Sequence, residues 1–297
     1  MATTEHVWHL RRHLLAREPF FVGEEVAVPG TVDTAFVGNG IHPDGEAHLA
    51  ATEYEKAVKI GETLSVPQDF FSVLSGGIVP VLIAPSPLAR ARETATYLFV
   101  GMAKAYAQNV HDISVLSPET QRVLAFQGLH KIAEVVLFEA LNETKYKNSR
   151  GKPDEGNELV AEAYHKIINP SFPGYQWMVQ KGFELDQRSE PPLKVMERGF
   201  RVMREVLTRS VILSTTHQPN LEIITAGLTG DLGTNARELW ERAGGGYELG
   251  GGFELRVLTN ASGKISDAQL RRTLKDLTKL EMVLNVDMDA LRRYMVQ

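Results

Sequence analysis

Short apolar runs rich in β-branched residues alternate with stretches of helical periodicity along this chain. The runs are too apolar for strands that keep one face in water, so they predict a sheet covered by helices on both faces. We therefore expect an α/β fold, a three-layer sandwich with a mostly parallel central sheet. The expected strands are residues 6–13, 78–85, 112–117, 210–217 and 253–259.

Helices are expected where apolar residues recur at a spacing of three or four. Pro43 and Pro87 mark the starts of two of them, because proline suits the first helical turn. The polar stretch NETKYKNSRGKPDEGNE predicts an exposed excursion from the sheet. We expect one domain over residues 1–297, with a lid or helical insertion at about 120–190 and a helical tail at about 266–297. The other expected helices are residues 42–64, 87–107, 191–209 and 220–227.

Composition excludes several classes of protein. The 297 residues contain no cysteine, which excludes disulfides, thiolate ligands and a cysteine nucleophile and suits a cytoplasmic protein. The formal net charge of -5 argues against general nucleic-acid binding. The longest apolar stretches, such as GGIVPVLIAP, are too short to span a bilayer, so no membrane association is expected.

The stretch EHVWHLRRHLLAREPF near the N-terminus has three interpretations. As a helix it would place His6, His9 and His13 on one face, as a metal site could require. The second interpretation is an ordinary amphipathic helix, which would turn Val7, Leu10 and Leu14 toward the protein interior.

The third interpretation is a strand that ends at Arg12-His13, and two other predicted strands end in matching chemistry. The run VLIAP leads into Ser86 and then Arg90, and the run VILSTT leads into His217. Active sites of open α/β sheets collect at the carboxyl ends of the strands. This interpretation therefore predicts that residues from three distant segments converge on one site.

Together these segments resemble the histidine phosphatase superfamily, which includes the cofactor-dependent phosphoglycerate mutases. The family opens with a strand ending in Arg-His-Gly, here Arg12-His13-Leu14, and continues with Leu-Thr-Pro-x-Gly, here matched by IHPDGEA at 41–47. Its Ser-x-Leu-x-Arg-Ala-x-x-Thr-Ala segment is matched by SPLARARETA at 86–95, and its second histidine by His217. Leu14 and Gln218 stand where the family has glycine. The resemblance implies a phosphoglycerate mutase-like fold.

The resemblance also implies roles for the matched residues. Arg12 and Arg90 would clamp the phosphoryl oxygens, because a guanidinium pairs with two oxygens at once. His13 would be the nucleophile and carry a phosphohistidine. A protonated His217 would add positive charge to the clamp. The expected substrate-binding residues are Ser86 and Gln218.

A carboxylic acid must also protonate the leaving oxygen. In the family it follows the third strand in a Leu-x-Glu setting. The distance from Thr94 favours Glu119, and Glu134 and Glu139 are the alternatives. No metal and no other cofactor is implied by the resemblance.

The expected function is hydrolysis of a phosphomonoester or related phosphoryl compound without a metal. One alternative is mutase-type phosphoryl transfer through the same residues. Another is a scaffold that binds a phosphorylated ligand without turnover, an interpretation suggested by Leu14 and Gln218. The expected partner is a small phosphorylated molecule or inorganic phosphate, and the stretch LRRTLKDLTKLEMVL could pack against a second copy of the chain.

Overall fold

The computed structural model describes residues 3–14, 48–67, 81–109, 133–141, 190, 192–217, 220–230 and 246–296. Its strands are β1 (Thr4–Arg12), β2 (Val81–Ile83), β3 (Ala133–Val135), β4 (Val211–Thr216), β5 (Gly252–Thr259), β6 (Ile265–Arg272) and β7 (Met282–Leu284). Its helices are η1 (Ala51–Glu53), α1 (Tyr54–Gly61), α3 (Ala89–Asn109), η4 (Glu139–Leu141), α7 (Pro192–Val206), α8 (Asn220–Thr229) and α10 (Met288–Val296).

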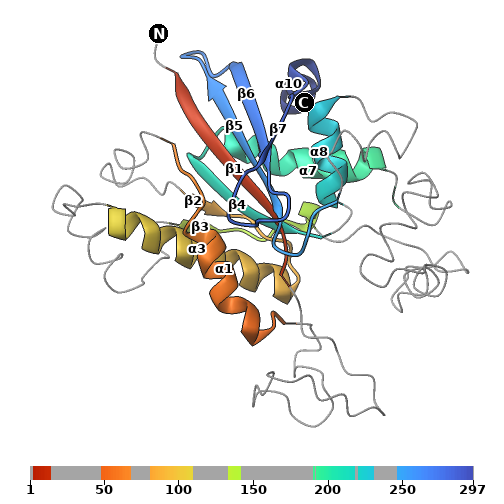
Figure 1. The fold of residues 1–297 in the computed structure, drawn as a ribbon. Helices are drawn as coiled ribbons and strands as arrows, with labels where there is room; N and C mark the ends of the chain where they lie inside the picture. Colours follow the sequence, from red (N-terminus) through yellow and green to blue (C-terminus); the bar gives the residue numbers. More distant parts are fainter. Residues whose placement is uncertain are drawn as a thin grey trace, which may run out of the picture.

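All seven strands form one sheet in the order β3-β2-β4-β1-β5-β6-β7 (Figure 1). The pairs β3–β2, β2–β4 and β4–β1 are parallel. The pairs β1–β5, β5–β6 and β6–β7 are antiparallel. The predicted α/β class is therefore confirmed, but the sheet is mixed and not mostly parallel, because the C-terminal part of the chain adds an antiparallel meander.

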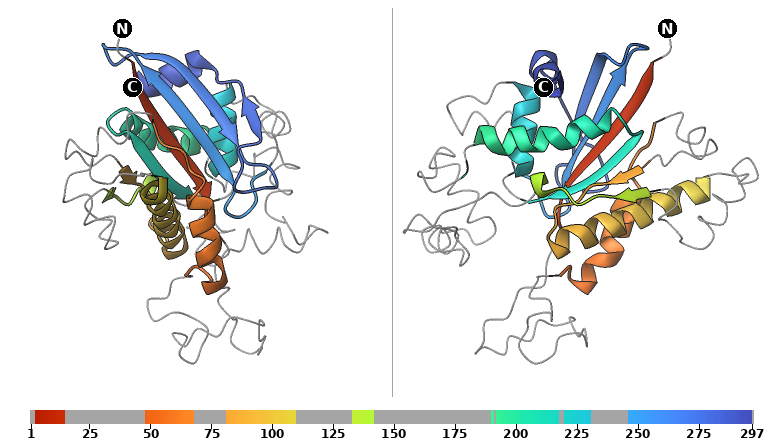
Figure 2. Two further views of the ribbon diagram at one scale, coloured as in Figure 1. Left: turned by 60° about the vertical axis from the view of Figure 1, so that its left-hand side comes forward. Right: turned by 180° about the vertical axis from the view of Figure 1, so that it is seen from behind.

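Two apolar clusters lie on opposite faces of the sheet. Neighbouring residues of β4 alternate between them: Ile212 belongs to one cluster, and Val211 and Leu213 belong to the other. The first cluster contains residues of α7, α8 and α10, and the second contains residues of α1 and α3. Figure 2 shows these two sets of helices on either side of the strands. Burial on both faces explains why β2 (VLI) and the first half of β4 (VIL) are wholly apolar.

The N-terminal stretch is a strand, so its side chains alternate between the two faces. The Nδ1 atom of His6 lies 2.9 Å from the carbonyl oxygen of Arg209. His9 points to the other face, where Nε2 lies 2.8 Å from the carbonyl oxygen of Ser65. The metal interpretation and the amphipathic-helix interpretation both needed a helix here, and both are wrong.

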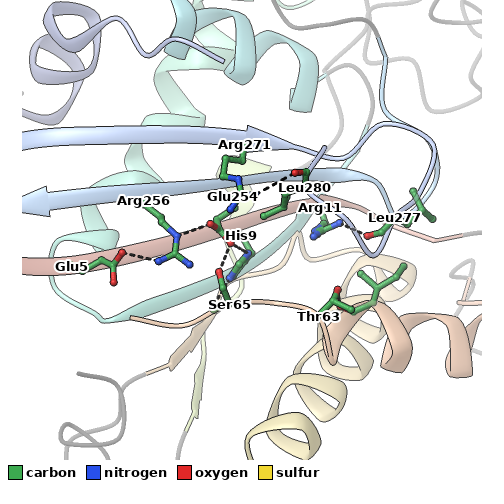
Figure 3. A network of polar contacts seen from close by, with 11 residues as sticks. Glu5, His9, Arg11, Thr63, Ser65, Glu254, Arg256, Arg271, Leu277 and Leu280 are labelled. Carbon is green, nitrogen blue, oxygen red and sulfur yellow. Dashed lines mark hydrogen bonds and ion pairs between the residues drawn. The ribbon is translucent and has the colours of Figure 1, made fainter. Parts of the chain in front are cut away.

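A buried polar network connects β1, β5 and the segment after α1 (Figure 3). The carboxylate of Glu254 accepts hydrogen bonds from the Ser65 hydroxyl and, at 2.6 Å, from Arg256 Nε. Arg256 also donates to Glu5 at 2.7 Å. Burial lowers the pKa of His9 to about 4, so its ring is neutral and its Nε2–H donates to Ser65. The network holds His9 opposite Glu254 in the β1–β5 register.

The predicted helical tail at 266–297 is wrong for most of its length. Residues 265–272 form β6 and residues 282–284 form β7, and only α10 is helical. Leu270, Leu274 and Leu277 have the spacing of a helical face, but Leu270 is buried as a strand residue opposite Leu255. Pairing with β5 therefore overrides the local helical pattern. The helical surface on which a second copy was expected to pack does not exist.

The predicted insertion at 120–190 contains a strand of the sheet. Residues 133–135 form β3 beside β2, and η4 follows directly. The predicted strand at 112–117, residues 42–47 of the first predicted helix and the rest of the insertion lie outside the described residues. In the described part of the chain, no helix combines the length and apolarity needed to cross a membrane.

Candidate active site

The carboxyl ends of β1, β2 and β4 bring three predicted residues to one edge of the sheet. The backbone N–H of His13 donates to the Thr216 carbonyl at 3.0 Å, immediately before His217. The backbone N–H of Ser86 donates to the Thr215 carbonyl at 2.9 Å. The parallel register therefore places His13, Ser86 and His217 side by side, although they are far apart in the sequence.

The two histidines face each other across this edge. Their ring centroids are 4.9 Å apart, and the rings are tilted by 49°. His13 Nδ1 lies 2.6 Å from the carbonyl oxygen of Leu14, which can only accept a hydrogen bond. Nδ1 therefore carries the proton, and the lone pair of the neutral ring is on Nε2. This tautomer suits Nε2 for nucleophilic attack.

Burial and positive charge lower the pKa of both rings. Burial, the Arg90 charge and the Arg12 charge together lower the pKa of His13 to about 3, and the Leu14 carbonyl opposes them. Burial also holds the pKa of His217 well below 6.5, with contributions from His13, Arg90, Arg12 and Arg198. The charges of Arg12 and Arg90 thus act on both histidines, so the four predicted residues share one site.

His217 is neutral in the protein without a bound anion, because its pKa is so far below its ordinary value. The surroundings of His217 therefore disfavour its expected protonated form. A phosphoryl dianion placed among these residues would favour the imidazolium and oppose the effect of the arginines.

Arg12 is held by the backbone of the glycine-rich loop. Its Nη1 donates to the carbonyl oxygen of Tyr247 at 2.9 Å, and the N–H of Tyr247 donates to the Glu222 carboxylate at 3.1 Å. Among the described residues, Arg12 forms no ion pair within 4.0 Å. The loop therefore fixes the guanidinium, and the Glu222 and Glu248 carboxylates lie close enough to act on its charge.

Ser86 connects the segment before α3 to His217. The side chain is fully buried, and its Oγ lies 2.9 Å from His217 Nε2. Oγ also accepts a long hydrogen bond of 3.4 Å from the N–H of Leu88, just before α3 begins. Ser86 thus caps the approach to the helix and orients His217 at the same time.

Leu14 does not enter the site. Its side chain is fully buried in the apolar cluster of α1 and α3, and its N–H donates to Thr94 Oγ1 at 3.2 Å. Gly250, at a φ of +83°, provides the space, because a Cβ there would lie 2.5 Å from Leu14 Cδ2. The replacement of the family's glycine therefore alters the packing beneath the site and leaves the Leu14 carbonyl in place for His13.

The three glutamates considered as proton donors differ in their placement. Glu134 lies on β3 and pairs with Arg209, which precedes β4, so its carboxylate lies toward the opposite end of the sheet from His217. Glu139 begins η4 and is exposed. Two residues later, the Leu141 carbonyl accepts a hydrogen bond of 2.8 Å from Thr216 Oγ1, beside His217. Glu119 and Gln218 lie outside the described residues.

Sequence reasoning missed Arg198 and Asn220. Arg198 contributes to the low pKa of His217, and it donates at 3.2 Å to the Asn220 side chain at the start of α8. In the sequence, Arg198 is marked only by its helical spacing of three and four from the buried apolar residues Val195 and Val202 of α7. Across the described ranges, no three His, Cys, Asp or Glu side chains gather as a metal site would require.

No protein-family model and no curated protein matches this chain. Among solved structures, a mycobacterial glucosyl-3-phosphoglycerate phosphatase in complex with VO3 is 14% identical over 91% of this chain and 98% of its own, with a TM-score of 0.41. A protein of Agrobacterium tumefaciens named as a candidate phosphohistidine phosphatase, SixA, is 14% identical over 89% and 96%, with a TM-score of 0.29. The phytase of Klebsiella sp. ASR1 is 16% identical over 94% and 85%, with a TM-score of 0.38. Because these identities and TM-scores are low, the chemistry of the site is inferred from the residues of this chain alone.

Proposed function

We propose that this chain is a divergent histidine phosphatase that hydrolyses a phosphomonoester through a phosphohistidine, without a metal. The observation that carries the proposal is the state of His13. Its Nδ1–H is bound to the Leu14 carbonyl at 2.6 Å, and its pKa of about 3 keeps the lone pair on Nε2. A neutral imidazole beside two arginines has the properties that a phosphoryl-accepting nucleophile needs.

In the first step, His13 Nε2 attacks phosphorus, the N–P bond forms and the bond to the leaving oxygen breaks. Arg12 and Arg90 neutralise the non-bridging oxygens, which carry the charge of the transition state. The dianion raises the pKa of the neighbouring His217, which then joins the clamp as a cation. In the second step, water attacks phosphorus, the N–P bond breaks and inorganic phosphate leaves.

Glu139 is our proposed proton donor to the leaving oxygen. It follows β3 directly, in a turn whose Leu141 carbonyl is bonded to Thr216. The chain order Leu137-Phe138-Glu139 also has the Leu-x-Glu form that the resemblance implies. After donating its proton, the carboxylate accepts one from the attacking water, so the two steps balance. Glu119 stays a prediction outside the described residues.

The scaffold alternative loses one of its two supports. Leu14 suggested this alternative because it replaces a glycine, but its side chain is buried in the core and its carbonyl holds His13. Mutase-type transfer uses the same residues and differs only in which acceptor takes the phosphoryl group from His13. A cytoplasmic location and a small phosphorylated partner also stay predictions.

Trapping the intermediate tests the proposal. Wild-type protein mixed with excess 32P-labelled phenyl phosphate and quenched in alkali should retain one acid-labile label, since phosphohistidine is stable in base. His13→Asn should retain none, and inorganic phosphate should be the product in water. Label retained equally by His13→Asn would reject His13 as the nucleophile. Label transfer to an added phosphorylated acceptor at the expense of free phosphate would identify the mutase alternative.

A further inference from the structure

The guanidinium of Arg198 connects α7 to the segments around the candidate site. Its Nε and Nη2 donate to the two carboxylate oxygens of Glu190, both at 3.1 Å. Nη1 donates to the Ala140 carbonyl at 2.5 Å, and Nη2 also donates to Asn220 Oδ1 at 3.2 Å. The side chains of Arg198 and Glu190 are each only 12% exposed. A fork held by a carboxylate in this way has a fixed orientation.

The segment that Arg198 holds is η4. The Ala140 carbonyl receives Arg198, and the next carbonyl, that of Leu141, receives Thr216 Oγ1 at 2.8 Å and Asn220 Nδ2 at 3.5 Å. A three-residue 3-10 turn has little stability of its own. Its position is therefore set by these external donors together with the Phe138 N–H, which donates to the Pro85 carbonyl at 2.9 Å. Glu139 lies between Phe138 and Ala140.

Figure 2 shows η4, in yellow-green, beside the ends of β1 and β4 that carry His13 and His217. We propose that Arg198 is a positioning residue, which acts by holding Ala140 and thereby setting the place of the Glu139 carboxyl relative to the phosphoryl group. This inference rests on the proposed function and on Glu139 as its proton donor. In this proposal Arg198 acts through Glu139 and makes no contact of its own with the reacting atoms.

Proton donation matters most when the leaving oxygen is strongly basic. The nitrophenolate released from p-nitrophenyl phosphate needs little help, whereas the phenolate released from phenyl phosphate is more basic and depends more on an acid. A misplaced Glu139 should therefore slow phenyl phosphate selectively. General damage to the site should slow both substrates to the same extent.

The experiment measures kcat and KM for both substrates in Arg198→Lys and Arg198→Met, with Glu139→Gln as the reference. For phenyl phosphate, the Arg198 variants should lose roughly 10- to 100-fold in kcat, the scale of a misplaced catalytic group. For p-nitrophenyl phosphate, we expect a loss below about threefold, with KM little changed for either substrate. Arg201→Met removes an exposed arginine from the same helix and should change neither rate.

Equal losses on both substrates, or no loss, would overturn the role of Arg198, provided Glu139→Gln shows the selective loss. Arg198→Lys keeps the charge and much of the length, so it carries the test if Arg198→Met has a strongly lowered melting temperature. A Glu139→Gln variant without selectivity would reject the proton donor, and this inference with it. A wild type that hydrolyses neither aryl phosphate would reject the proposed function before any variant is compared.

Discussion

The Nδ1 atom of His13 lies 2.6 Å from the carbonyl oxygen of Leu14, so the residue that departs from the expected glycine supplies the contact that sets the tautomer of the proposed nucleophile. The Leu14 side chain turns away into the core, against Gly250. The orientation of the His13 ring therefore depends on how the Leu14 side chain packs beneath it.

Gly250→Ala should destabilise the protein and reduce turnover. The new methyl group would lie 2.5 Å from Leu14 Cδ2, and the residue would be held at a φ of +83°. We expect a loss of about 2–3 kcal/mol in the free energy of unfolding, from strain and overpacking together.

Gly263→Ala is the matched control, because its φ is +74° and no atom lies within 4 Å of the added methyl. It should cost only the conformational strain, about 1 kcal/mol, with turnover unchanged. Urea unfolding of both variants measures the difference. Equal losses of unfolding free energy in the two variants would show that a clash with Leu14 adds nothing to the cost of a methyl group at position 250.

Arg90→Ala should weaken the binding of inorganic phosphate by about 2–3 kcal/mol, the scale of a lost charge-assisted contact. The reason is that Arg90 acts on both histidines of the site. Arg92→Ala, two residues along the same helix, is the control and should alter the affinity much less. Calorimetric titration with phosphate gives both values, and a larger effect at Arg92 would contradict the assignment.

The stability of the protein should fall in mild acid, and His9 should account for part of the loss. Its pKa is about 4 in the folded protein against 6.5 for the free side chain, because its burial disfavours the charged ring. The unfolded chain therefore takes up the proton first as the pH falls. The stabilisation is complete above pH 6.5 and is lost toward pH 4, by a total of about 3 kcal/mol for this residue.

His9→Gln removes the titration and keeps a side-chain N–H that can reach the Ser65 carbonyl. Between pH 6.5 and 4, its free energy of unfolding should fall less steeply than that of the wild type. The remaining slope should include His13 and His217, whose pKa values are lowered in the same direction. Parallel curves for wild type and variant, obtained from urea midpoints, would exclude His9 as a contributor.

Local patterns were sufficient to predict β1, β2 and β4 of the parallel half of the sheet, whereas β3 lies within the predicted insertion. A run of buried β-branched residues identifies β4, and β1 follows because its end, Arg12-His13, matches the chemistry at the ends of two other strands. The same reasoning failed for β6. Leu270, Leu274 and Leu277 have the spacing of a helical face. Leu270 lies in a strand only because β6 pairs with β5.

The support of the site could not be predicted from the sequence for a different reason. Arg198 reaches Ala140 and Asn220 only because α7 packs over η4 and the start of α8. Its neighbours in the sequence give no sign of these contacts. The same holds for the Tyr247 carbonyl, which binds Arg12 from a loop 235 residues away.

The central claim is that His13 is a nucleophile within an oxyanion site, and one pair of measurements on His13→Ala tests it most directly. Turnover of phenyl phosphate should fall below detection, because the attacking nitrogen is gone. Phosphate affinity by calorimetry should be largely retained, since Arg12 and Arg90 still supply the positive charge. Turnover of His13→Ala at close to the wild-type rate would contradict the account.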